Sequence, residues 1–105
     1  MRPLDALDRA NTVRRGNAQA KHAIRAAGRT AGARIAAKLV VGADCSLRFE
    51  ALLLAVPRVG DKRARLMLGL AEINPLAKVN DPHITPRQRQ ALADQLDAYA
   101  NGEPL

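Results

Sequence analysis

The 105-residue chain has few aromatic residues, cysteines and histidines, and each shortage argues against a class of protein. It contains no Trp, one Tyr and one Phe, which argues against a nucleic-acid platform that stacks bases on aromatic rings. The single cysteine, Cys45, cannot form an intrachain disulfide and is typical of a reducing cytosol. One cysteine and two histidines are poor material for a structural zinc site, so we expect no metal and no other cofactor. No run of 18 apolar residues predicts a membrane span, and residues 1–5 lack the apolar core of a signal peptide.

Acidic residues are missing from a long N-terminal stretch, because none lies between Asp8 and Asp44. The chain has 17 Lys and Arg against 10 Asp and Glu, which gives a formal charge of +7 and a pI of about 10.8. Residues 1–48 hold ten of the basic residues and three acids, whereas residues 49–105 hold seven of each sign. This asymmetry favours a polyanionic partner over a merely solubilising surplus, and the partner we expect is nucleic acid.

The distribution of alanine, proline and glycine predicts a helical fold. Twenty-one residues are Ala, the best helix former, and no proline lies between Leu4 and Val56. We expect a helix over about 4–27, a break at Gly28-Arg29-Thr30, and a second helix to about Val41. Ser46 is expected to cap a third helix after a connection at 42–46.

The second half of the chain predicts shorter helices joined by turns. Residues 57–60 form a tight turn, and a helix with apolar residues three and four apart runs from Asp61 to near Glu72. After a loop, Thr85-Pro86 begins a last helix that ends at Asn101-Gly102. We therefore expect an all-α single domain, 1–105, of about five helices: a basic helical arm (1–45), a compact core (46–100) and a tail (101–105). The predicted core residues are Leu47, Leu52, Leu53, Val56, Val59, Met67, Leu68, Ile73, Leu92 and Leu96.

A basic stripe is predicted on the first helix. At 100° per residue, Arg14, Arg15, Lys21 and Arg25 fall with His22 within an arc of about 120°. Four cations on one face repel one another slightly, and a row of phosphates would neutralise them with release of counterions. An ordinary solvated face would mix acids with bases, which this segment does not.

A second basic feature is the turn Val56-Pro57-Arg58-Val59-Gly60-Asp61-Lys62-Arg63-Ala64. We expect Gly60 to adopt dihedral angles that favour glycine and to let a ligand approach the backbone. The first amides of the next helix are free donors at its positive end, which suits a phosphate, and Lys62 and Arg63 add charge there. A plain helix–helix turn with Asp61 as its cap is the alternative.

Residues 51–64 resemble the actinobacterial integration host factor family of nucleoid-associated proteins, and their turn is similar to the hairpin of helix-two-turns-helix DNA-binding folds. Arg14-Arg15, Lys21, Ile73-Asn74-Pro75 and residues 87–92 extend the resemblance, which runs from about Leu7 to Leu96. It implies sequence-tolerant binding of double-stranded DNA by the long basic helix and the two-turn element. It also implies DNA bending and compaction, assistance to a phage integrase or recombinase, and a cytoplasmic location on the nucleoid. The loop after Pro75 departs from the family, because only Lys78 remains where the family has a run of arginines.

These observations predict a monomeric, non-enzymatic DNA-binding protein. No acid–base pair accompanies Cys45, and Asp94 with Asp97 lacks a third catalytic partner, so no active site is expected. Two alternatives stay open: a ribosome-associated RNA-binding protein, and a helical protein-interaction module whose charge is incidental. The predicted DNA contacts are Arg14, Arg15, Lys21, Arg25, Arg29, Arg58, Val59, Gly60, Lys62, Arg63, Lys78, Arg87 and Arg89.

Overall fold

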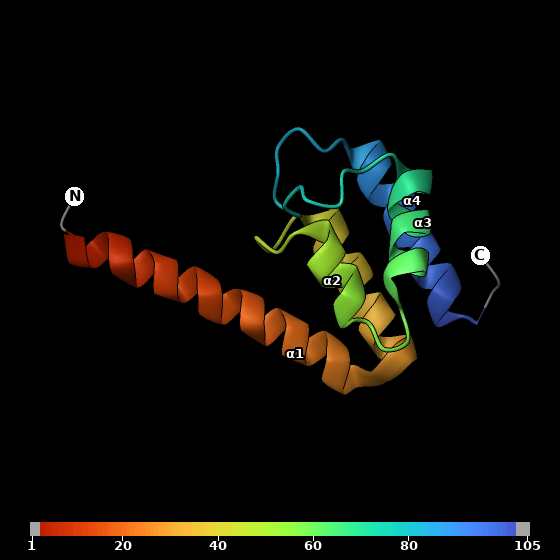
Figure 1. Cartoon of the computed structure of the whole chain (residues 1–105), viewed down its shortest axis with the longest axis horizontal. Helices are drawn as coiled ribbons and strands as arrows, with labels where there is room; N and C mark the ends of the chain where they lie inside the picture. Colours follow the sequence, from red (N-terminus) through yellow and green to blue (C-terminus); the bar gives the residue numbers. More distant parts are fainter. Residues whose placement is uncertain (1–2, 103–105) are drawn as a thin grey trace.

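The computed structural model describes the backbone of residues 3–102 and the side chains of residues 11–102. Residues 103–105 of the predicted tail lie outside the described part. Within residues 3–102, four helices follow one another: α1 (Pro3–Gly42), α2 (Phe49–Ala55), α3 (Asp61–Ala71) and α4 (Pro86–Ala100) (Figure 1). The all-α class is therefore confirmed, but the helices number four and not about five. The two helices predicted before residue 42 form one element, since helix resumes directly after a kink at Gly28.

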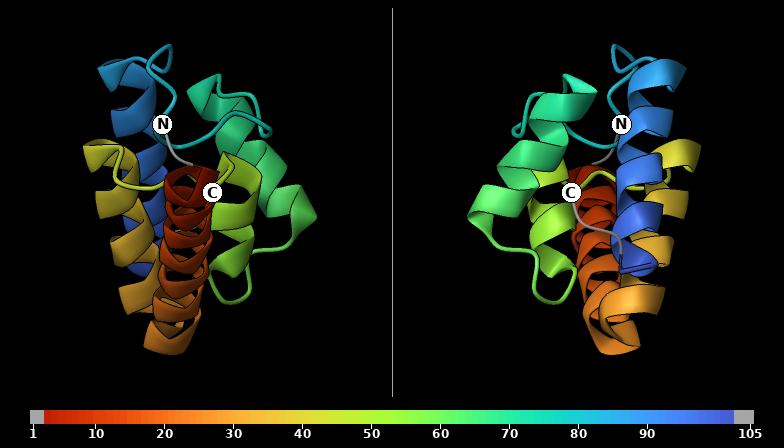
Figure 2. Two further views of the ribbon diagram at one scale, coloured as in Figure 1. Left: turned by 90° about the vertical axis from the view of Figure 1, so that its left-hand side faces the viewer. Right: turned by 90° about the vertical axis from the view of Figure 1, so that its right-hand side faces the viewer.

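The kink at Gly28 divides α1 into a projecting arm, residues 3–27, and a half that runs back through the rest of the molecule (Figures 1 and 2). Gly28 has φ 89° and ψ −176°, a combination that is essentially restricted to glycine. One turn later, a Cβ atom on Gly32 would lie 2.4 Å from the carbonyl oxygen of Ile24. The two glycines together allow the sharp change of direction. The arm also explains a radius of gyration of 14.0 Å, against about 13 Å for a compact domain of this length.

The half of α1 after the kink, residues 29–42, belongs to the compact part of the molecule, which we call the body (residues 29–102). Its Ala33, Ala36, Ala37 and Val40 are buried, and it packs along α4. Small side chains let the two helices approach closely. The predicted arm of residues 1–45 is therefore too long, because the sequence pattern gave no sign that 29–42 is a central core helix.

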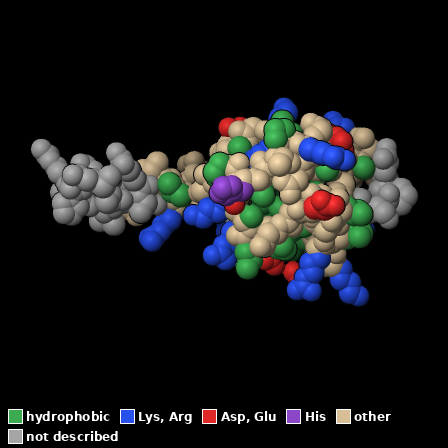
Figure 3. Space-filling model, turned by 90° about the horizontal axis from the view of Figure 1, so that it is seen from above, with side chains coloured by type: hydrophobic (Ala, Val, Ile, Leu, Met, Phe, Trp, Pro, Cys, Tyr) green, Lys and Arg blue, Asp and Glu red, His purple; other side chains and the backbone are tan. Residues whose placement is uncertain are grey.

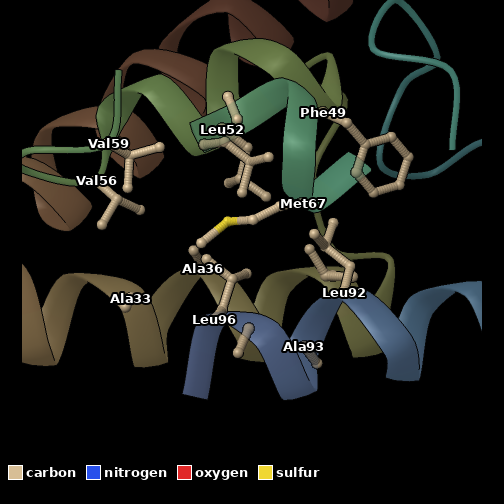
Figure 4. Packing of buried hydrophobic residues seen from close by; sticks show 14 of the residues in the cluster. Ala33, Ala36, Phe49, Leu52, Val56, Val59, Met67, Leu92, Ala93 and Leu96 are labelled. Atoms are coloured by element: carbon tan, nitrogen blue, oxygen red, sulfur yellow. The ribbon is translucent and has the colours of Figure 1, made fainter. Parts of the chain in front are cut away.

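The core is formed by side chains from all four helices. Figure 4 shows Met67 of α3 between Leu52 of α2, Ala36 of α1 and Leu96 of α4. All ten predicted core residues are buried, which confirms that prediction, and the core also contains residues that were not on the predicted list, among them Ile24, Phe49, Val79, Ala93 and Tyr99.

The helix ends show one confirmed cap and one wrong prediction. Thr85 caps α4, since its hydroxyl accepts from the Gln88 amide at 3.1 Å while the Gln88 side chain accepts from the Thr85 amide at 2.8 Å. Ser46 does not cap α2, whose first two amides instead donate to the carbonyls of Ala77 and Pro75. The Ser46 hydroxyl donates to Oδ1 of Asn17 at 3.0 Å, which ties the arm to the connection before α2.

Candidate nucleic-acid interface

The arm has a body-facing side and a cationic flank. Ile24 is fully buried, Ala20 packs against the core, and Asn17 accepts the Ser46 hydrogen bond, so these residues mark the side toward the body. At 100° per residue, three exposed cations lie on a single flank, roughly 70–110° from that direction, and a fourth points directly outward. The flank cations are Arg14, Lys21 and Arg25, and the outward one is Arg15. The opposite flank carries the neutral Gln19, Ala23 and Ala27.

The cations of the surface are not neutralised by neighbouring carboxylates. Within residues 11–102, no Lys or Arg nitrogen lies within the 4.0 Å of a carboxylate oxygen that defines an ion pair. Figure 3 shows Lys and Arg side chains beside the arm and, along the same edge of the molecule, on the body, with acidic side chains between. The described cations are therefore not held in ion pairs and remain available to an external partner.

One end of the body brings distant parts of the chain together, and we call it the vertex. The kink of α1, the turn between α2 and α3, and the C-terminal end of α4 meet there in both figures (Figures 1 and 2). Tyr99 connects them: the guanidinium carbon of Arg29 lies 4.6 Å from its ring centroid, and that of Arg63 lies 5.1 Å away. The Tyr99 hydroxyl donates to the carbonyl of Pro57 at 2.7 Å. The structure thus joins two predicted basic segments that are far apart in the sequence.

The turn at 57–60 has a different backbone from the one predicted. Gly60 has φ −93° and ψ 179°, ordinary extended angles that any residue adopts, and the positive φ of 67° falls on Arg58. The expectation of special angles at Gly60 is wrong, because the chain reverses two residues earlier. Gly60 is nevertheless exposed, and a Cβ atom there would have no heavy atom within 4 Å. An approaching ligand would meet open backbone at this point.

The start of α3 supports part of the predicted turn surface. Gly60 is the N-cap of α3, no side chain caps this helix, and Asp61 lies in its first turn. The alternative, in which Asp61 caps the helix, is therefore wrong. Arg58, Lys62 and Arg63 are all exposed. Val59 is different: its side chain is buried and its amide donates to the Val56 carbonyl at 3.1 Å. Val59 therefore stabilises the turn, and its buried side chain is not available for the predicted DNA contact.

Arg89 is a structural residue and not a surface contact. It is 8 % exposed, and its guanidinium donates to the backbone carbonyls of Val40, Val79 and Asp81. Its donors are used inside the fold, so the prediction that it contacts DNA is wrong.

Lys78 and Arg87 are exposed but lie away from the vertex. The 76–85 loop and the start of α4 are at the opposite end of the body from the α2–α3 turn (Figures 1 and 2). The structure therefore brings together the arm, Arg29 and the turn, and leaves Lys78 and Arg87 apart. Sequence reasoning did not identify Tyr99 as the residue that connects the three parts of the vertex. The available signal was that the chain has one tyrosine, which lies near the end of a helix.

The described residues hold no other recognisable chemistry. Among the side chains of residues 11–102, no group of three His, Cys, Asp or Glu is placed to hold a metal ion. No helix within residues 3–102 is long and apolar enough to cross a membrane. Burial raises the pKa of the half-buried Cys45 thiol, and Asp44 raises it further, against a backbone hydrogen bond at Leu47 that lowers it. A raised pKa keeps the thiol protonated and unreactive.

No family model, curated protein or solved structure matches the chain. Its function is therefore inferred from the placement of its charges and from the residue pattern of the turn.

Proposed function

We propose that this protein binds the backbone of double-stranded DNA with little sequence preference, as an architectural protein of the integration host factor type. The observation that carries the proposal is the arm: a helix that projects from the body with unpaired cations on one flank and ends at a second cluster of cations. Eight exposed cations belong to this surface: Arg14, Arg15, Lys21, Arg25, Arg29, Arg58, Lys62 and Arg63.

The dimensions of the arm suit a duplex. Residues 3–27 form a helix about 37 Å long, at about 1.5 Å per residue, which corresponds to about eleven base pairs. A helix with its side chains is about 10–12 Å across and the major groove is about 12 Å wide, so the arm can enter it. Its flank cations would then face the phosphates at the groove edge. Lys and Arg contacts of this kind fix position without reading bases, which is why little sequence preference is expected.

The shape of the molecule supports DNA bending as part of the same proposal. The body protrudes beside the arm and carries its own cations at the vertex (Figure 1). A duplex that follows the arm and also contacts the turn must curve toward the body, and the extra phosphate contacts offset the cost of bending. Compaction and assistance to a recombinase are proposed on the same basis.

Equilibrium binding of matched variants tests the proposal. We expect Lys21→Ala/Arg25→Ala to weaken binding to a duplex of about 20 base pairs by about tenfold or more at moderate salt. The matched control is Lys38→Ala/Arg48→Ala, which removes the same charge from two exposed positions outside the proposed surface and should change the affinity less than about threefold. Folding should survive both changes, because Lys21, Arg25 and Lys38 are exposed helix positions where Ala is well tolerated. Arg48 is exposed before α2, and its side chain does not cap that helix.

A structured RNA hairpin of similar length is measured in the same buffer. Tighter binding of the hairpin than of the duplex would favour the ribosome-associated alternative. Equal losses in the two double variants would mean that total charge, and not the arm, determines binding.

A further inference from the structure

We infer that Tyr99 is a positioning residue that joins the kink of α1, where the arm ends, and the turn into one phosphate-binding surface, by holding Arg29 and Arg63 on its ring while its hydroxyl fixes the turn. This inference rests on the proposed function and adds to it the element that makes two separate basic segments act together.

The contacts of Tyr99 reach both segments at once. Its side chain is 1 % exposed, whereas Arg29 and Arg63 are exposed. The two guanidinium carbons lie 4.6 and 5.1 Å from the ring centroid, so they are no farther apart than about 9.7 Å. Arg29 is the first residue after the kink and Arg63 is in the first turn of α3. A buried ring therefore sets the separation of two exposed cations from different elements.

The ring orders these side chains without consuming their hydrogen-bond donors. A guanidinium that stacks on an aromatic face keeps the N–H groups of its planar edge available for a phosphate. Free arginine side chains lose rotamer freedom when they bind, and ordering them beforehand reduces that cost. Among the described residues, neither arginine makes an ion pair or a side-chain hydrogen bond that would hold it elsewhere.

The hydroxyl of Tyr99 fixes the third part of the vertex. It donates to the Pro57 carbonyl at 2.7 Å, one residue before Arg58, which carries the positive φ of the turn. The position of the turn relative to the kink is thereby set through α4. A single duplex can meet Arg29 and the turn residues together because this geometry is present before binding.

A measurement without DNA tests the arrangement itself. In the nuclear magnetic resonance spectrum of the wild-type protein, the Nε–H and δ-methylene protons of Arg29 and Arg63 should be shifted upfield by the ring current, relative to those of Arg25. The shifts should persist in Tyr99→Phe and disappear in Tyr99→Leu. Ordinary shifts for both arginines in the wild-type protein would overturn the inference, whatever the protein binds.

A binding cycle tests the role. Tyr99→Leu leaves the net charge unchanged and should weaken duplex binding about tenfold, since two arginines must then be ordered on binding. In an Arg29→Ala/Arg63→Ala background, the same change should alter affinity less than about twofold. Tyr99→Phe, which keeps the ring, should stay closer to wild type than Tyr99→Leu.

Two results of this cycle would overturn the inference. An equal loss with and without the arginines would mean that Tyr99 only supports the fold, and an unchanged affinity in Tyr99→Leu would mean that the ring does not matter. If the wild-type protein binds no duplex, the proposed function fails, and the proton shifts still decide whether Tyr99 positions the two arginines.

Discussion

Replacement of Gly28 by Ala should destabilise the protein, because the kink that separates arm from body depends on this residue. Its φ of 89° with ψ −176° is a region that costs a residue with a Cβ atom about 1–3 kcal/mol. The chain could avoid that strain by straightening α1, but the arm would then pull Ile24 out of the core. Ile24 is 0 % exposed, and exposing it costs about 1.5–3 kcal/mol. Strain at residue 28 and exposure of Ile24 cost similar amounts, so the free energy of unfolding should fall by about 1–3 kcal/mol in either case.

Thermal unfolding followed by circular dichroism measures this loss. For a domain of this size, 1 kcal/mol corresponds to about 4–8 °C, so the melting temperature should fall by about 5–20 °C. Gly69→Ala is the matched control: Gly69 is exposed within α3, has no heavy atom within 4 Å of a Cβ position, and should gain about 0.5–1 kcal/mol. Small-angle scattering distinguishes the two routes, since a straightened arm raises the radius of gyration above 14.0 Å. The reasoning is refuted if Gly28→Ala is as stable as wild type or is stabilised like Gly69→Ala.

Three further predictions concern single positions. Gly32→Ala should also destabilise the protein, because its Cβ atom would lie 2.4 Å from the Ile24 carbonyl oxygen; a melting temperature equal to that of wild type would show that the kink relaxes freely. Arg89→Ala removes the charged donor of three carbonyl groups, of which those of Val40 and Asp81 keep a hydrogen bond from a backbone amide, and should cost about 3–5 kcal/mol in chemical denaturation, while duplex affinity of the folded fraction stays within about twofold. A large loss of affinity with unchanged stability would instead make Arg89 a DNA contact. The Cys45 thiol, whose pKa is raised by burial, should react with iodoacetamide at pH 8 more slowly in the folded protein than in denaturant, and equal rates would contradict its burial.

The sequence predicted those features that depend on local patterns. Thr85-Pro86 followed by Gln88 predicts a helix start because the cap needs only residues within one turn, and the structure confirms it. The core positions of α3 and α4 follow from apolar spacing, which is why Met67 and Leu96 were predicted correctly.

The features that sequence reasoning missed depend on contacts between distant segments. Arg89 has the appearance of a surface arginine, because nothing local shows that three carbonyl groups from residues 40, 79 and 81 converge on it. The position of Gly28 was correctly predicted as a break, but its angles, and therefore the direction of the arm, follow from packing against the body. Tyr99 likewise acquires its role only when the kink and the turn meet at the end of α4.

The salt dependence of duplex binding tests the central claim most directly. If the eight exposed cations of the arm and the vertex each neutralise one phosphate, the logarithm of the association constant should fall with the logarithm of salt concentration with a slope of about −7. Removing Lys21 and Arg25 should make the slope less negative by about two, since each lost contact contributes about one. A slope near zero, or a slope that the double variant leaves unchanged, would contradict binding of the DNA backbone by this surface.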